Sequence, residues 1–222
     1  MQEAQGGRAW LLDLTARHPE LDECVADIDA AYRLLEACYS GGGQVLVCGN
    51  GGSAADCEHL VGELMKGFVT RRPLPDEVAQ KFAQTHPDGG RELAGRLQGA
   101  LPAISLVSQT GIATAIANDM GGDLVFAQQV YGYGRPGGAL IAISTSGNSE
   151  NVLAALRVAR VLRMGTIGFT GREGGAMVDL CDVAIRVPHD ETGRIQELHL
   201  PIYHTLCGML EDTFFAAPQE ER

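Results

Sequence analysis

Two residues near the start of the chain have the spacing of a functional pair. His59 and Glu63 are four residues apart in "CEHLVGELMKGF", a stretch with a helical pattern. On a helix this offset places both side chains on one face. An imidazole and a carboxylate there suit a shared metal ion, or a general base beside a polarising group. The same spacing is typical of a solvated helix contact, so the pair alone leaves these interpretations open.

A loop rich in hydroxyl groups is the second candidate. It follows an apolar run in "LIAISTSGNSENV", and its small and polar residues are Ser144, Thr145, Ser146, Gly147, Asn148 and Ser149. Hydroxyls, free amides and a helix N-terminus can together hold a phosphate without a lysine. No Walker lysine and no G-x-G-x-x-G is present, which favours a small phosphorylated metabolite over ATP or a dinucleotide. The simpler alternative is that Ser149 only caps the helix.

Two polar residues near the C-terminus complete the set. Gln196 and His204 are eight residues apart, roughly 80° around a helix, and therefore lie on one side of it. Isolated residues of these types on an amphipathic helix are usually bystanders. They gain significance only if the fold brings them to His59 and Glu63.

The elements that must position these residues follow an alternating pattern. Short apolar runs predict buried parallel strands at 44–50, 102–108, 139–146, 165–171 and 182–188. Helical patterns lie between them, as at 149–165, and residues 8–40 have the pattern of a helix that ends at a run of glycines. This alternation predicts a sheet with helices on both faces. Pro201 should kink or interrupt the final helix.

One long polar segment, residues 70–101, breaks the rhythm. It contains two short helical patterns and prolines, and connections of this length in compact domains are often lids or oligomer contacts. A tolerated surface insertion is the alternative interpretation. We therefore divide the chain into an N-terminal helical segment, 1–43, and an α/β domain, 44–216, that carries the insertion.

Charge and cysteine content exclude some partners. The 222 residues carry a net charge of −11, which disfavours nucleic acid or an anionic membrane as the main partner. The six cysteines have no regular spacing, so we expect free thiols in a reducing cytoplasm. Neither a signal peptide nor an apolar run long enough to span a membrane is recognisable.

Several stretches together resemble the sugar isomerase (SIS) domain family. They are "CGNGGSAADCEH", "IANDMGGDLVF", "ISTSGNSENVLAAL", "GFTGREGGAM" and "RIQELH" followed by His204, and the resemblance covers roughly residues 15–215 apart from 70–101. The two loop motifs are specific for the SIS fold. His59, Glu63, Gln196 and His204 narrow the resemblance to phosphoheptose isomerases.

The resemblance implies a fold, a reaction and a site. The fold is a three-layer α/β sandwich with a five-stranded, mostly parallel, flavodoxin-like sheet and an N-terminal helical extension. The reaction is the isomerisation of sedoheptulose 7-phosphate to D-glycero-D-manno-heptose 7-phosphate through an enediol, with Glu63 and His204 as base and acid. The implied zinc ligands are His59, Glu63, Gln196 and His204. The implied substrate-binding residues are Asn50, Gly51, Gly52, Ser53, Asn118, Asp119, Ser144, Thr145, Ser146, Ser149 and Gln196. A homotetramer with active sites between subunits is also implied.

The chain departs from the family pattern at three places, one of which is the segment 70–101, longer than is usual in the family. Gly193 stands where the family often has aspartate, and Gly67, beside Lys66, stands where it commonly has arginine. We expect Arg71 or Arg72 to replace that arginine, in contact with phosphate or with a neighbouring subunit. The departures keep two alternatives open: an isomerase of another sugar phosphate, and a non-catalytic SIS protein that senses phosphosugars or binds a partner.

Overall fold

The fold is built on a five-stranded parallel sheet, as predicted. The computed structural model describes residues 3–216, and its strands lie in the order β2-β1-β3-β4-β5, with every neighbouring pair parallel. The strands are β1 (Val45–Gly49), β2 (Ala103–Ser105), β3 (Ala139–Ile143), β4 (Gly165–Thr170) and β5 (Val183–Arg186). Each lies inside one of the five predicted runs. The order 2-1-3-4-5 is that of flavodoxin-like folds, which reverse direction between β1 and β3.

Both faces of the sheet are covered, which explains the nearly continuous apolar runs. β1 and β3 are buried along their whole length. Successive side chains point to opposite faces. Val45 and Val47 therefore belong to one hydrophobic cluster, whereas Leu46 and Cys48 belong to the other.

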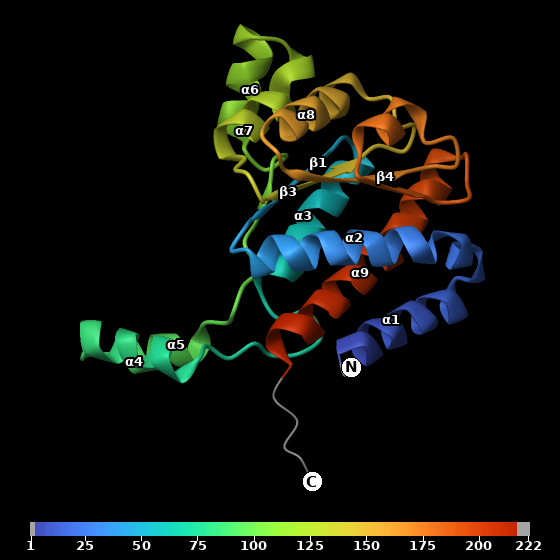
Figure 1. The fold of residues 1–222 in the computed structure, drawn as a ribbon. Coiled ribbons are helices and arrows are strands. Elements are labelled where there is room, and N and C mark those ends of the chain that lie inside the picture. Colours follow the sequence, from blue (N-terminus) through green and yellow to red (C-terminus); the bar gives the residue numbers. More distant parts are fainter. Residues whose placement is uncertain (1–2, 217–222) are drawn as a thin grey trace.

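Helices form the two outer layers (Figure 1). One layer contains α1 (Glu3–Arg17), α2 (Val25–Ser40), α3 (Gly52–Met65) and α9 (Thr192–Phe215). The other contains α6 (Thr110–Asp119), α7 (Val125–Tyr133) and α8 (Glu150–Val161). Short 3-10 helices are η1 (Pro19–Cys24), η2 (Gly122–Leu124) and η3 (Gly175–Leu180).

Two helix predictions were wrong in detail. Residues 8–40 are not one helix, because α1 ends at Arg17 and η1 begins at Pro19 before α2 starts. Proline lacks the N–H that a continuous helix needs and favours a new helical start. Pro201 does not interrupt α9, which runs through it, whereas a kink at this proline stays a prediction. His199, Pro201 and Ile202 are buried, although Leu200 is exposed, and this packing holds the helical path despite the missing hydrogen bond.

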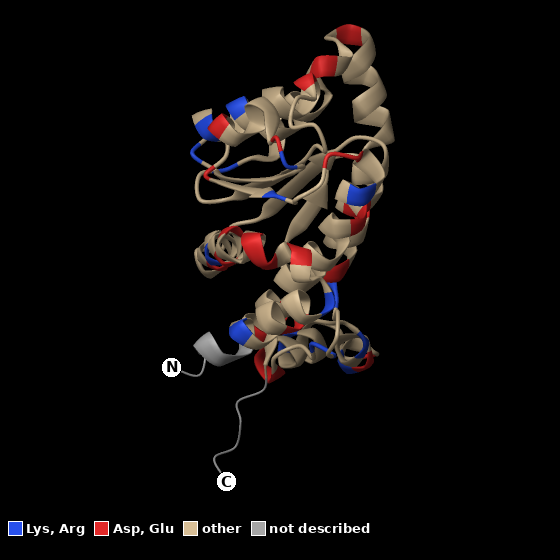
Figure 2. Cartoon of the chain, turned by 90° about the vertical axis from the view of Figure 1, so that its right-hand side faces the viewer, with Lys and Arg blue, Asp and Glu red and all other residues tan. Residues whose placement is uncertain are grey.

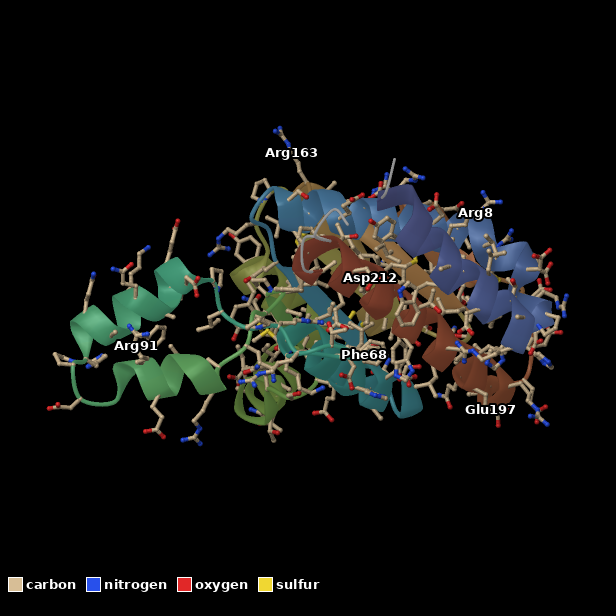
Figure 3. All side chains as sticks on the ribbon, turned by 90° about the horizontal axis from the view of Figure 1, so that it is seen from below. Arg8, Phe68, Arg91, Arg163, Glu197 and Asp212 are labelled. Carbon is tan, nitrogen blue, oxygen red and sulfur yellow. The ribbon has the colours of Figure 1, made fainter. Side chains whose placement is uncertain are left out.

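The segment 70–101 forms an arm. Its two predicted helices are α4 (Asp76–Thr85) and α5 (Gly90–Arg96), which pack against each other and project from the body (Figure 1). Figure 3, with Arg91 on the arm, shows the same separation from below. A bridge between Pro73 and Gln98 closes its root. A lid or oligomer contact stays a prediction for this arm.

On the face that Figure 2 presents, acidic and basic residues are interspersed along the helices without forming a broad basic patch. Among residues 3–216, none of the helices has the length and apolar character needed to cross a membrane.

Candidate active site

The two glycine-containing loops meet where the strand order reverses. The loop after β1 and the loop after β3 leave the carboxyl ends of adjacent strands, the usual ligand position in this type of sheet. Asn50 in the first loop and Asn151 at the start of α8 exchange two side-chain hydrogen bonds, of 2.8 and 2.9 Å. The predicted substrate-binding residues Asn50 to Ser53 therefore lie next to the hydroxyl loop.

The hydroxyl loop has the form of an anion site. Ser149 stands at the N-cap of α8, yet its side chain makes no capping hydrogen bond. Its hydroxyl lies 3.0 Å from that of Ser144, which is almost buried. The capping interpretation does not account for this contact, because both hydroxyls remain at the helix N-terminus with a lone pair or proton to offer a ligand.

The tight shape of this loop requires glycine. Gly147 has φ +64°, and a Cβ there would lie 1.8 Å from the carbonyl oxygen of Gly174. Asn148 then ties the loop to η3, since its Oδ1 accepts the amide proton of Ala176 at 2.9 Å. The loop is thus held rigidly before any ligand binds, which lowers the entropy cost of binding.

The predicted catalytic residues meet between α3 and α9. His59 Nε2 lies 3.4 Å from Glu63 Oε1, as the four-residue spacing predicted. His204, 145 residues along the chain, brings its Nε2 to 3.3 Å from the same His59 nitrogen. The structure therefore brings together His59, Glu63 and His204, three of the four predicted zinc ligands, from two helices that are far apart in the sequence.

Neighbouring charges tune this cluster, which we call the His59 cluster (His59, Glu63 and His204). Lys66 Nζ donates to Glu63 Oε2 at 2.6 Å, leaving Oε1 toward His59. Burial and the nearby His59 lower the pKa of His204, and Glu63 partly opposes this. A neutral imidazole beside a carboxylate can accept or donate a proton near neutral pH.

The residue types and spacing of the His59 cluster suit zinc. Histidine nitrogen and glutamate oxygen are zinc ligands, and tetrahedral bonds of 2.0–2.1 Å place neighbouring ligand atoms roughly 3.3 Å apart. The separations of 3.4 and 3.3 Å match that length. Across residues 3–216, however, no group of three or more His, Cys, Asp or Glu side chains has an arrangement that could hold a metal ion. Zinc therefore stays a prediction here.

Three other predicted residues lie apart from the His59 cluster. The Gln196 amide lies over Gly52, where an added Cβ would come within 2.6 Å of its Nε2. Eight residues separate Gln196 from His204, about 12 Å along α9. Asn118 and Asp119, at the end of α6, are exposed and bonded to each other at 2.8 Å. Their roles in substrate or metal binding stay predictions.

The expectation for Arg72 was wrong. This residue is fully buried, and its guanidinium donates to Glu211 Oε1 at 2.8 Å and to the carbonyl oxygens of Glu63 and Leu64. It cannot reach a phosphate or a neighbouring subunit from there. Arg71 is exposed and bonds the carbonyl oxygen of Gly95 within the arm.

The sequence patterns also missed two residues behind His59. Tyr203 is fully buried, and its hydroxyl lies 3.0 Å from His59 Nδ1 and 3.3 Å from Asp56 Oδ1. The available signal was their position: Asp56 is three residues before His59, and Tyr203 is adjacent to His204. A third histidine, His199 on α9, is fully buried against Phe169, and burial lowers its pKa to about 4. We therefore do not count His199 in the His59 cluster.

Comparisons with known proteins agree with this architecture. Residues 14–87 and 91–171 match the family described as the SIS domain. The phosphoheptose isomerase of Rhodospirillum rubrum is 41% identical over 192 residues, covering 86% of this chain and 88% of that protein. The phosphoheptose isomerase of Desulfovibrio desulfuricans is 43% identical over 181 residues, covering 82% of this chain and 74% of that protein.

Solved structures give the same result at the level of the fold. Phosphoheptose isomerase GmhA from Neisseria gonorrhoeae has a TM-score of 0.68 and 33% identity, covering 93% of this chain and 98% of that chain. A phosphoheptose isomerase from Francisella tularensis has a TM-score of 0.73 and 30% identity, covering 96% and 99%.

Proposed function

The chain belongs to the SIS domain family, and on this basis we propose that it is an aldose–ketose isomerase of sedoheptulose 7-phosphate. The product is D-glycero-D-manno-heptose 7-phosphate. The observation that carries the proposal is the meeting of His59, Glu63 and His204 between α3 and α9. In a chain with phosphoheptose isomerases as relatives, this cluster supplies the carboxylate and imidazole that an enediol reaction needs.

The reaction is a balanced transfer of protons. Glu63 removes the proton from C1 of the ketose while His204 protonates the oxygen on C2, which gives an enediol. His204 then takes the proton from the oxygen on C1, and Glu63 returns its proton to C2, which gives the aldose. The hydroxyl loop holds the remote phosphate, and that binding energy positions the reacting carbons.

Zinc forms part of the proposal. His59, Glu63 and His204 would hold it, and bound zinc would polarise the substrate carbonyl. A carboxylate bound tightly to zinc is a poor base, so Glu63 would not serve as zinc ligand and as base at the same time. Gln196 lies over Gly52, about 12 Å along α9 from His204, and is left out of this part of the proposal. His59 Nε2, His204 Nε2 and Glu63 Oε1 are atoms of the types that bind zinc, and their proximity supports this part of the proposal. Metal analysis of the purified protein and a titration with zinc after chelation test this part separately.

The proposed reaction is tested directly. The protein is incubated with sedoheptulose 7-phosphate, with and without zinc, and formation of the heptose 7-phosphate is followed by NMR. Appearance of the aldose signals supports the proposal. No turnover of sedoheptulose 7-phosphate with or without zinc, while another ketose phosphate reacts, would reject this substrate. A protein partner in stoichiometric amount without any isomerase activity would favour a non-catalytic SIS protein.

We propose further that the active site lies between subunits of a homotetramer. His59 and Glu63 are seven and eleven residues after Gly52, which places the His59 cluster about 10–16 Å from the first loop along α3. A second copy of the chain can bring its own cluster to the hydroxyl loop of the first. The same proposal includes a reducing, cytoplasmic setting, because all six cysteines are free thiols.

Mixing two inactive variants should restore activity if subunits share a site. Glu63→Gln removes the base, whereas Ser149→Asp keeps a good N-cap but places a negative charge against the phosphate. We expect co-refolded mixtures to be clearly more active than the sum of the two variants alone. Mixtures of Glu63→Gln with His204→Ala are the control and should stay inactive, because both residues lie in the same cluster.

The outcome depends on subunit exchange, which native mass spectrometry measures in the same samples. Mixed oligomers with no gain in activity would contradict a shared site.

A further inference from the structure

Behind the His59 cluster lies a short chain of hydrogen-bonding groups. The Tyr203 hydroxyl lies between Asp56 Oδ1, at 3.3 Å, and His59 Nδ1, at 3.0 Å. Tyr203 is fully buried, and its ring packs edge-on against the rings of His59 and His204. Asp56 Oδ2 is buried and has no hydrogen-bond partner, so Tyr203 is the one side-chain donor to this carboxylate among the described residues.

The chain of contacts determines where the protons lie. An ionised carboxylate only accepts hydrogen bonds, and a tyrosine hydroxyl has a single proton to donate. Tyr203 therefore donates to Asp56, and its oxygen is left as an acceptor toward His59. That contact is a hydrogen bond only if His59 carries its proton on Nδ1.

The position of the proton on Nδ1 also determines what the other ring nitrogen, Nε2, presents to the site. With the proton on Nδ1, the lone pair of Nε2 points toward Glu63 Oε1 and His204 Nε2, at 3.4 and 3.3 Å. That is the side on which a shared cation or a transferred proton would lie. The other tautomer would point an N–H toward Glu63 Oε1, which could accept it at 3.4 Å. It would, however, leave the Tyr203 oxygen, whose proton is donated to Asp56, facing an unprotonated Nδ1 at 3.0 Å.

We propose that Asp56 and Tyr203 are positioning residues that fix His59 in the Nδ1–H tautomer, with Nε2 directed into the site. Neither residue touches substrate; both act through the His59 ring. The inference rests on the proposed function for the role of His59, whereas the tautomer itself can be measured in unliganded, chelator-treated protein.

The tautomer is read from the ring signals of histidine labelled with ¹³C and ¹⁵N, at about pH 8, where a free imidazole is neutral. His59 is assigned by comparison with His59→Gln. We expect Nδ1–H for His59 in the natural sequence. In Asp56→Ala, Tyr203 is free to donate to Nδ1, so the proton of His59 should move to Nε2. Tyr203→Phe should remove the preference and lower kcat about 10–100-fold.

Tyr39→Phe is the matched control. The Tyr39 hydroxyl is buried and has no hydrogen-bond partner within residues 3–216, so its loss removes the same group from the core without touching His59. This variant should keep both the Nδ1–H signal and the activity. An Nε2–H tautomer in the natural sequence, or an unchanged tautomer in Tyr203→Phe, would overturn the proposal. Absence of isomerase activity would refute the proposed function and leave the tautomer result intact.

Discussion

Replacing Glu63 with glutamine should lower kcat by at least about 100-fold, the range for losing a general base. Glutamine keeps the size of the side chain and can still accept a hydrogen bond from Lys66, now 2.6 Å from Glu63 Oε2. It cannot take a proton from C1. Turnover is measured by NMR with sedoheptulose 7-phosphate, and exchange of the C1 proton into D₂O reports the proton-removal step itself.

Two control variants separate chemistry from structure. Glu58→Gln changes an exposed carboxylate on the same helix, which bonds Ser108, and should leave kcat near normal. Lys66→Met breaks the ion pair of Glu63 but keeps the carboxylate, so it should cost much less than Glu63→Gln. Near-normal turnover in Glu63→Gln would remove this residue from the mechanism, and equal losses in both variants would reduce its role to the ion pair.

The sheet and the local pairs could be read from the sequence because their signals are local. The buried run at β3 and the i, i+4 spacing of His59 and Glu63 each lie within a few residues. The ends of helices were predicted less accurately than the strands. The break at Pro19 was visible as a proline, whereas the continuity through Pro201 depends on packing around α9 that no local pattern records.

What the sequence patterns missed depends on contacts between distant segments. Tyr203 is 144 residues from His59, and Arg72 is 139 residues from Glu211. Gly67 stands where the family commonly has arginine, so the prediction let Arg71 or Arg72 take that role at a phosphate or a neighbouring subunit. Only the fold shows that a carboxylate from α9 is buried beside it. The resemblance to a family could supply the roles of matching residues, but not these supporting contacts.

The Arg72–Glu211 pair holds the end of α3, the root of the arm and α9 together. Glu211 accepts the amide protons of Phe68, Val69 and Thr70 at 2.8–2.9 Å, as well as the Arg72 guanidinium. Figure 3 shows Phe68 close to the part of α9 that carries Asp212. Arg72 in turn donates to the carbonyl oxygen of Glu63 at 3.0 Å. The pair thus connects the helix of the proposed base with the helix of His204.

Replacing Arg72 with methionine should lower the free energy of unfolding by about 3–5 kcal/mol, because it leaves the Glu211 carboxylate buried without its counter-charge. The measurement is urea unfolding followed by circular dichroism at a fixed protein concentration. Arg33→Met is the control, since Arg33 pairs with Asp29 on an exposed helix face and should leave the midpoint almost unchanged. A loss in Arg72→Met as small as in this control would contradict a structural role for the pair.

The pH dependence of Glu211→Gln tests the same pair from the carboxylate side. Burial alone would raise the pKa of Glu211, but three backbone amides and Arg72 outweigh it, so the pKa lies below its ordinary value of 4.5. The stabilisation is therefore complete above the unfolded-state pKa and is lost as the pH falls through the folded-state pKa. The natural sequence should be clearly more stable than Glu211→Gln at neutral pH, and the difference should shrink below pH 4.5. A difference that stays constant with pH would mean that the charge of Glu211 does not stabilise the fold.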